Sequence, residues 1–260
     1  MALPARSNVP TVVAIAVVAY VAADVVHEVA HAITGRWVGV PLLSISTVAL
    51  QTAGRSRIMA AAGTSAEVIA GACALASAAR RRRFGSTTYL LWLFGLVSAM
   101  NVGYLAFSAV TNTGDWAVVI DGLSPPLPWR AAIGALGGVG YAVTVRAAAH
   151  VMQRFLDRGV VSFADVRRLT YPAYLAGGAL MTVASMFNPI GPSLILLSGA
   201  GASFGLTWGL LMIGGMVDAG DASQRASDYV HRDVRWLVAA AVVGAAFVAV
   251  LGPGIRIGGR

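Results

Sequence analysis

Residues 9–33 read VPTVVAIAVVAYVAADVVHEVAHAI, an apolar run that is long enough to cross a bilayer and that contains an HExxH motif near its end. The two histidines, His27 and His31, lie within about 40° of each other on a helix that turns about 100° per residue. Their imidazoles can therefore hold one zinc ion (Zn²⁺), and Glu28 beside them can take a proton from a water as general base. The pattern predicts a zinc site that hydrolyses peptides within a membrane.

A polar cluster at the membrane surface is the alternative interpretation of the motif, with the histidines bonded to backbone or lipid headgroups. The chain has 4 histidines and only two glutamates, one of them Glu28, so HExxH has little chance of arising at random. Polar groups at membrane depth are costly and are usually functional. We therefore favour the metal site.

The composition indicates an integral membrane protein. The chain is 57% hydrophobic and 12% charged, whereas soluble domains average about 25% charged residues. Its net charge of +8 comes from 19 basic residues, all of them arginine, and 11 acidic residues. The arginines cluster at the ends of apolar segments, as they do at membrane flanks. We therefore expect a lipid bilayer as partner and no nucleic acid.

Seven apolar runs of about 20 residues determine the predicted fold. The runs are 9–33, 58–79, 87–110, 131–151, 171–188, 192–217 and 235–252. Between the first two, residues 36–57 are rich in β-branched side chains that partly alternate with polar ones, which favours one or two short strands. We expect an all-α polytopic membrane protein with about six to seven transmembrane helices and a short β-strand or hairpin segment after the first helix.

A catalytic zinc usually takes three protein ligands and leaves a fourth position open for water. If each span crosses the membrane once, residues 111–130 lie on the same side as His31, and they contain Asp115 and Asp121. Asp115 follows a flexible Asn-Thr-Gly break that can turn its carboxylate into the bundle, whereas Asp121 is followed by a glycine and two prolines typical of a surface turn. We favour Asp115 and keep Asp121 as the alternative. Two further histidines fall on the opposite side of the membrane, His150 and His231.

Four other polar residues are candidates for supporting roles at the site. Asp24, one turn before the motif, can accept a hydrogen bond from an imidazole N–H or line a water path. Glu67 is a carboxylate within the second apolar run and Asn101 an amide within the third, and each either takes part in function or joins helices by hydrogen bonds. Asn112 can line the polar cleft through which water reaches the metal.

The sequence around the motif resembles the site-2 protease clan of intramembrane zinc metalloproteases. In that clan a first-span HExxH, here HEVAHAITGR at residues 27–36, is followed by short strands. Residues 61–67, AAGTSAE, resemble the clan's AGPxxN stretch, with Glu67 in place of the asparagine. The likeness covers roughly residues 10–122 and is closest to the compact bacterial branch that has no PDZ domain.

The resemblance implies a set of site residues, namely the zinc ligands His27, His31 and Asp115 and the general base Glu28. The clan's second motif is an asparagine, a proline-containing spacer and then Leu-Asp-Gly. Both residues 112–115 and residues 120–122 can match it, so Asp121 stays open as the alternative third ligand.

The function expected from these features is intramembrane proteolysis by a multi-pass protein of the bacterial inner membrane. Residues 1–130 would form the zinc metalloprotease-like core, and residues 131–260 would add transmembrane helices to the same membrane domain. The substrate would be a transmembrane protein that pairs in extended form with an edge strand within residues 42–50. The rival is a non-catalytic membrane protein, either a pseudoprotease that binds partner helices or a metal-handling transporter. The intact Glu28 and the clustering of polar residues at one end of the spans favour the enzyme.

The orientation in the membrane stays open. Six arginines lie on the predicted His31 side and thirteen on the other, which places the zinc toward the outer leaflet by the positive-inside rule. The resemblance implies the cytoplasmic side instead. The sequence does not specify an oligomeric state.

Overall fold

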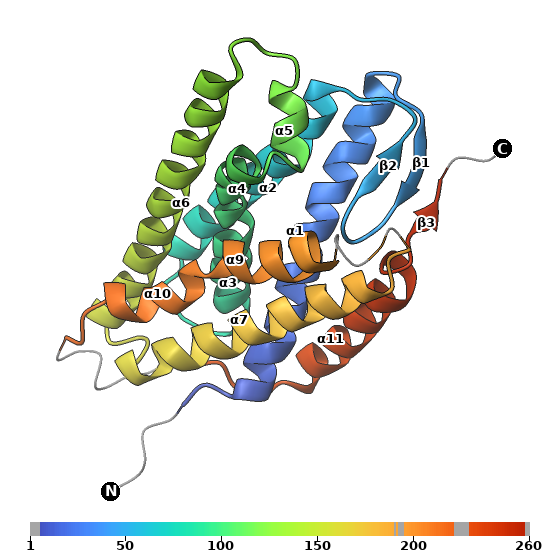
Figure 1. The fold of residues 1–260 in the computed structure, drawn as a ribbon. Coiled ribbons are helices and arrows are strands. Elements are labelled where there is room, and N and C mark those ends of the chain that lie inside the picture. The colour runs from blue at the N-terminus through green and yellow to red at the C-terminus, as the bar shows by residue number, and fades with distance from the viewer. Residues whose placement is uncertain (1–5, 190, 192–194, 221–228, 258–260) are drawn as a thin grey trace, which may run out of the picture.

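The computed structural model describes residues 6–189, 191, 195–220 and 229–257. They form a bundle of helices with a small sheet at one side (Figure 1). The helical elements are α1 (Val9–Trp37), α2 (Arg57–Ala79), α3 (Ser86–Met100), η1 (Asn101–Gly103), α4 (Tyr104–Thr111), α5 (Asp115–Ile120), α6 (Pro126–Asp157), α7 (Phe163–Met186), η2 (Ile195–Ala202), α9 (Ser203–Thr207), α10 (Gly209–Met216), α11 (Val234–Ala246) and η4 (Phe247–Leu251). The strands are β1 (Leu42–Ile45), β2 (Leu50–Thr52) and β3 (Ile255–Arg256).

Five helical stretches in the described part of the chain are long and apolar enough to cross a membrane, fewer than the predicted six to seven. They are Val9–Trp37, Arg57–Ala79, Ser86–Thr111, Pro126–Asp157 and Val234–Leu251. The predicted run 171–188 overlaps α7, which contains Pro172 and is not apolar enough. The run 192–217 is divided among η2, α9 and α10, and its first residues, 192–194, lie outside the described residues. Apolar composition indicates burial, but it does not show whether one continuous helix forms.

The segment 36–57 contains the predicted strands. β1 and β2 form an antiparallel hairpin, in which Ile45 pairs with Leu50. β3, from near the C-terminus, pairs with the other side of β1, so the strand order is β2-β1-β3 (Figure 1). The expectation of an edge strand within residues 42–50 is wrong for β1, because both of its sides are paired. The edges of this sheet are β2 and β3.

Helix α1 is central and packs against α2, α3, α7 and α11. Its inner face, which includes Val12 and Ala19 at 0% exposure, lies in a core with large side chains of α3, α6 and α7. Within that core the hydroxyl of Tyr89 donates a hydrogen bond to the carbonyl of Leu169 at 2.6 Å. The core thus joins residues of both predicted segments, and the predicted boundary after residue 130 lies inside α6.

Helices α2 and α3 approach closely because each presents a glycine to the other. A Cβ on Gly71 would lie 2.5 Å from the backbone nitrogen of Ala99, and one on Gly95 would lie 2.7 Å from that of Leu75. No side chain fits into these gaps, so the two backbones are in contact, as small residues allow between membrane helices. The contact fixes the position of Glu67, one turn before Gly71 on α2.

Gly71→Ala is expected to lower the free energy of unfolding by about 1–3 kcal/mol, because the new methyl group forces α2 and α3 apart. Gly138→Ala on α6 is the matched control, since a Cβ there meets no atom within 4 Å. Unfolding of both variants in detergent, by heat or denaturant, gives the comparison. Equal stability of the two variants would contradict this account of the contact.

Candidate metal centre

Helix α1 carries the motif in its last three turns. It begins after Asn8, whose Oδ1 accepts hydrogen bonds from the backbone nitrogen of Thr11 at 3.1 Å and from its hydroxyl at 2.8 Å, a side-chain cap. It then continues for 29 residues. One unbroken helix keeps His27 and His31 on the same face, one turn apart. His31 and Glu28 are 5% and 7% exposed, so the motif lies inside the protein.

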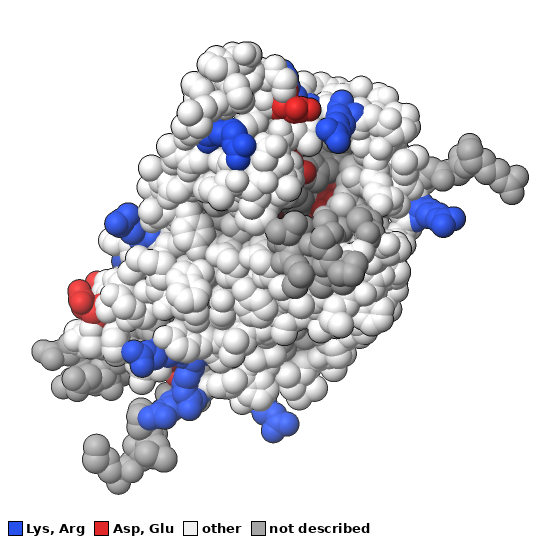
Figure 2. All heavy atoms as spheres, in the orientation of Figure 1, with Lys and Arg blue, Asp and Glu red and all other residues white. Residues whose placement is uncertain are grey.

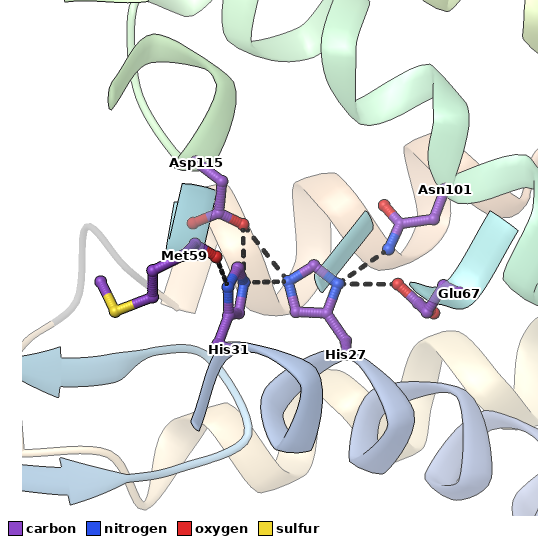
Figure 3. Close-up of polar contacts among 6 residues, drawn as sticks. All are labelled: His27, His31, Met59, Glu67, Asn101 and Asp115. Carbon is purple, nitrogen blue, oxygen red and sulfur yellow. Dashed lines mark hydrogen bonds and ion pairs between the residues drawn. The ribbon is translucent and has the colours of Figure 1, made fainter. Parts of the chain in front are cut away.

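Asp115, at the start of α5, completes a triangle with the two histidines (Figure 3). Its Oδ2 lies 3.1 Å from His31 Nε2 and 3.3 Å from His27 Nε2, and the two Nε2 atoms are 2.9 Å apart. A tetrahedral zinc with bonds of about 2.0–2.1 Å places neighbouring ligand atoms about 3.3 Å apart. This ligand triangle therefore has nearly the size that a metal ion requires, and it can hold one.

The outer nitrogens of both imidazoles are held by α2 (Figure 3). His27 Nδ1 bonds to Glu67 Oε2 at 2.7 Å, and His31 Nδ1 donates to the carbonyl oxygen of Met59 at 2.7 Å. Such bonds orient metal-binding imidazoles and keep the proton on Nδ1. Two Nε2 lone pairs and one carboxylate oxygen then converge on one point, where a cation stabilises all three.

The supporting groups form one stripe along α2. Met59, Gly63 and Glu67 are four residues apart, and α2 runs antiparallel to α1, so Met59 meets His31 and Glu67 meets His27. Between these two contacts, a Cβ on Gly63 would strike His31 Nε2 and lie 2.7 Å from His27 Nε2. The glycine thus leaves the space that the imidazoles and a metal ion need.

Of this stripe, the sequence predicted only Glu67 as a functional residue. Met59 contributes its backbone carbonyl, a group that every residue has, so the residue type at this position does not indicate the role. Gly63 had a usable signal, since it lies four residues before an intramembrane carboxylate and within the AAGTSAE stretch.

Of the two roles considered for Asp24, the structure gives that of imidazole acceptor to Glu67. Glu67 and Met59 bond to the two Nδ1 atoms. Asp24 lies one turn earlier on α1, where it lines a cavity beside His27 and where its Oδ2 is buried without a partner among the described residues. Spacing within α1 fixes how far Asp24 lies from the motif, but the packing of α2 decides which group meets the imidazole.

The turn before α5 directs Asp115 toward the histidines. Asn112 has a left-handed backbone with φ of 56°, and Gly114 has φ of 79°, so the chain changes direction at the predicted Asn-Thr-Gly break. The hydroxyl of Tyr104 packs against Gly114, where a Cβ would strike it. Burial raises the pKa of the Asp115 carboxyl, but the contacts of its Oδ2 with the two histidines outweigh burial and hold this pKa well below its usual value. Asp115 is therefore an anion, as a metal-binding carboxylate must be.

The alternative third ligand, Asp121, lies away from the histidines. Its side chain is exposed, and its Oδ2 is 3.8 Å from Arg55 Nη1, while its backbone carbonyl accepts a hydrogen bond from Arg57 at 2.5 Å. His150 and His231 are also exposed. In the part of the chain that the structure describes, the ligand triangle is the one group of His, Cys, Asp or Glu residues that can hold a metal.

The two predicted asparagines differ in their relation to the motif. Asn112 is exposed, ends α4 and lines a surface pocket with Arg55 and Arg130, not the cleft beside the ligand triangle. The side-chain nitrogen of Asn101 lies 3.2 Å from His27 Nδ1 (Figure 3). Asn101 thus belongs to the site, and Asn112 shapes the turn that leads to Asp115.

The ligand triangle lies at the floor of a cleft of about 400 Å³, walled by β2, the start of α2 and α5. Figure 2 shows a hollow on this face with acidic side chains inside it. Glu28 contributes to the wall, and its Oε2 is buried without a hydrogen-bond partner among the described residues. This carboxylate oxygen can therefore bind a water or a substrate group beside the metal position.

Comparisons with known proteins add no relative from which a role could be transferred. No family model, curated protein or solved structure matches this chain. The interpretation of the site therefore depends on its own geometry.

Protein purified without chelators is expected to hold about one divalent metal ion per chain. Asp115→Asn is expected to lose most of this metal, because the ligand triangle loses its anionic member. Asp121→Asn is the matched control, since it makes the same chemical change at an exposed carboxylate, and it should keep the metal. Elemental analysis gives the metal content. Retention in Asp115→Asn with loss in Asp121→Asn would move the third ligand to Asp121.

Glu67→Gln is expected to weaken metal binding about 10–100-fold, because the carboxylate orients His27. Thr64→Val, one turn earlier on α2, is the control, since Thr64 Oγ1 is buried without a partner in the described residues. Competition with a chelating dye of known affinity measures both variants. An affinity of Glu67→Gln equal to that of wild type would show that the contact with His27 does not support the metal.

Proposed function

We propose that this protein is an intramembrane zinc metalloprotease of the bacterial inner membrane, with the mechanism of the site-2 protease clan. The observation that carries the proposal is the Glu28 carboxylate beside the ligand triangle, in the wall of an open cleft, with its Oε2 buried and without a partner among the described residues. Both histidines and this carboxylate come from one helix, which is long and apolar enough to cross a membrane.

Zinc is the metal that fits the donor set best. Two imidazole nitrogens and one carboxylate oxygen, with a further position open to a cleft, are the pattern of catalytic zinc sites. When bound, zinc would polarise a peptide carbonyl and lower the pKa of a water molecule. His27, His31 and Asp115 would hold the ion, and Glu67 and the Met59 carbonyl would keep the imidazoles in place.

Glu28 would carry out the proton transfers. Its carboxylate takes a proton from the water whose oxygen forms a bond with the scissile carbonyl carbon. The same carboxyl then gives this proton to the amide nitrogen as the C–N bond breaks, which leaves a new carboxyl terminus and a new amine. At 7% exposure, Glu28 is shielded from bulk solvent, so its proton passes between the reacting groups.

The depth of the motif suits a substrate within the membrane. His27 lies ten residues before the end of α1 at Trp37, about 15 Å along the axis, and eighteen residues after Val9, about 27 Å. A helix of this length that crosses hydrocarbon of about 30 Å would hold the motif inside the membrane and nearer to one surface. The cleft would then admit water from that side.

An extended substrate segment would find a free strand edge beside the ligand triangle. β1 is paired on both sides, whereas among the described residues β2 is paired with β1 alone, and Leu50 and Thr52 of β2 line the cleft. A peptide that pairs with β2 would present its carbonyls to the cleft. A transmembrane helix satisfies its own backbone hydrogen bonds, so a transmembrane protein substrate would unwind locally before it is cut.

The packing of α1 favours this enzyme over the non-catalytic alternatives. A metal-handling transporter needs a polar path through the whole bundle, but on the N-terminal side of Tyr20 the inner face of α1 is closed. There Val12, Ile15 and Ala16 are each 0% exposed and pack in the main core. A pseudoprotease commonly lacks a ligand or the base, whereas Glu28 and the ligand triangle are all present here.

The test of this function compares wild type with Glu28→Gln, both loaded with zinc, in proteoliposomes that contain single-span peptides with a helix-weakening Asn-Gly pair. Wild type is expected to cut these peptides within the span. Glu28→Gln is expected to keep its zinc and to cut at least about 100-fold more slowly, because general-base catalysis contributes about 10²–10⁴-fold. Mass spectrometry of the fragments identifies the cut bond.

Asp121→Asn is the control for this experiment, since it removes an exposed carboxylate outside the cleft wall, and it should cut at the wild-type rate. Cleavage by Glu28→Gln as fast as by wild type would remove Glu28 from the mechanism. Absence of zinc-dependent cleavage in every form would leave a non-catalytic, helix-binding protein.

A further inference from the structure

A second cavity adjoins the cleft and extends deeper into the bundle. It has a volume of about 140 Å³ and lies between α1, the end of α3, α7 and α9. His27, Glu28 and Tyr104 line both the cavity and the cleft, so the two spaces meet beside the ligand triangle. We name this second space the inner chamber. The hydrolytic steps described above do not use it.

Four polar side chains that line the inner chamber have a buried atom without a hydrogen-bond partner among the described residues, namely Tyr20, Asp24, Glu28 and Thr47. Thr47 is 3% exposed, and its Oγ1 has no hydrogen-bond partner among the described residues. Asp24 Oδ2 is likewise buried and unpartnered in that part of the chain. A buried carboxylate oxygen without a partner is costly. The inner chamber therefore suits a group that donates hydrogen bonds and carries positive charge.

The rest of the lining suits a long side chain. Apolar walls come from Val48, Val97, Met181 and Leu206, and no arginine is among the described residues that line the chamber. Lysine and arginine bury their methylene stems against apolar surface and keep the charged end in polar surroundings. The apolar walls and the Asp24 carboxylate offer both environments within one cavity.

A bound metal ion fits the inner chamber less well than a basic side chain. Asp24 belongs to no group of His, Cys, Asp or Glu residues that can hold a metal, because the ligand triangle is the one such group in the described residues. Glu67, which also lines the chamber, is bonded to His27. Glu28 also lines the chamber, but it is assigned to the proton transfers, so Asp24 is the carboxylate that remains for one ammonium or guanidinium group, held by charge-assisted hydrogen bonds.

The distance from Asp24 to the reacting groups matches the length of one side chain. Asp24 precedes Glu28 by four residues, which is about 6 Å along α1. A substrate residue whose backbone lies beside Glu28 can span this distance with the four-carbon stem of lysine. The charged end would then reach Asp24 while the stem contacts the apolar walls.

We propose that the inner chamber is a specificity pocket that takes a lysine or arginine side chain of the substrate next to the scissile bond, with Asp24 as its anionic partner. This inference rests on the proposed proteolytic function. It makes Asp24 a specificity-determining residue, distinct from the groups that hold the metal or transfer protons.

Binding to zinc-loaded Glu28→Gln protein tests the pocket without catalysis. The probes are labelled single-span peptides in detergent, in which one residue near the Asn-Gly pair is lysine, norleucine or glutamate, scanned over successive positions. At one position the lysine peptide is expected to bind about tenfold more tightly than the norleucine peptide, as a desolvated charge pair allows. This preference should disappear when Asp24→Asn is added. Fluorescence anisotropy gives the dissociation constants.

Asp121→Asn, added in place of Asp24→Asn, is the matched control and should keep the preference for lysine. The zinc content of the Asp24→Asn protein shows whether the ligand triangle is intact. Equal binding of lysine and norleucine peptides at every position would overturn the pocket, and so would a preference that survives Asp24→Asn.

Cleavage of the same peptides by protein with Glu28 intact separates this inference from the proposed function. If the lysine preference in binding is found but no peptide is cut, the pocket stands and the proteolytic function fails. If all peptides are cut and bound alike, the function stands and the pocket is wrong. If the lysine peptides are both bound and cut preferentially, both proposals are supported.

Discussion

The antiparallel contact between α1 and α2 determines where the groups of the candidate metal site lie. Two hydrogen bonds, from His27 to Glu67 and from His31 to Met59, hold the helices in one register. A shift of α2 by one turn would bring a side chain to the place of Gly63, where a Cβ already meets both Nε2 atoms. Such a shift would therefore fill the space between the two imidazoles. His27 and His31 on α1 are four residues apart, as are Met59, Gly63 and Glu67 on α2, so the contacting faces of the two helices match.

Packing outside the site maintains that register. The glycine contact between α2 and α3 fixes the position of α2, and the packing of the buried inner face of α1 fixes the position of α1. Asp115 reaches the same point from α5 through the turn that begins at Asn112. Because the three ligands come from two elements far apart in the sequence, a bound metal would link them and stabilise the folded bundle by its binding free energy.

Local patterns made one part of the site predictable from sequence, and tertiary contacts decided the rest. The HExxH spacing places His27 and His31 on one helical face in any fold. The order of the apolar runs placed Asp115 and Asp121 on the His31 side, and the Asn-Thr-Gly break before Asp115 favoured it over Asp121. Glu67, and not Asp24, is the partner of His27 because of how α2 packs against α1. The periodicity along α1 gives no information about this packing. The Met59 carbonyl was not predictable, because every residue has one. Residues 195–216 read as one apolar run, since composition does not distinguish the π-helix η2 from the α-helices α9 and α10 that follow it.

Among the described residues, the outer edge of β2 has no strand beside it, so its peptide groups need other hydrogen-bond partners. Peptide groups without partners are expensive in hydrocarbon, so at membrane depth the outer N–H and C=O groups of β2 need water whenever no peptide lies beside them. In the proposed protease, the wall of the cleft would thus keep water, the reagent of hydrolysis, next to Glu28 when no substrate is bound. A substrate strand that pairs with β2 would displace the water bound to β2 but not the water at the opposite wall. The same peptide groups of β2 would therefore bind either water or substrate.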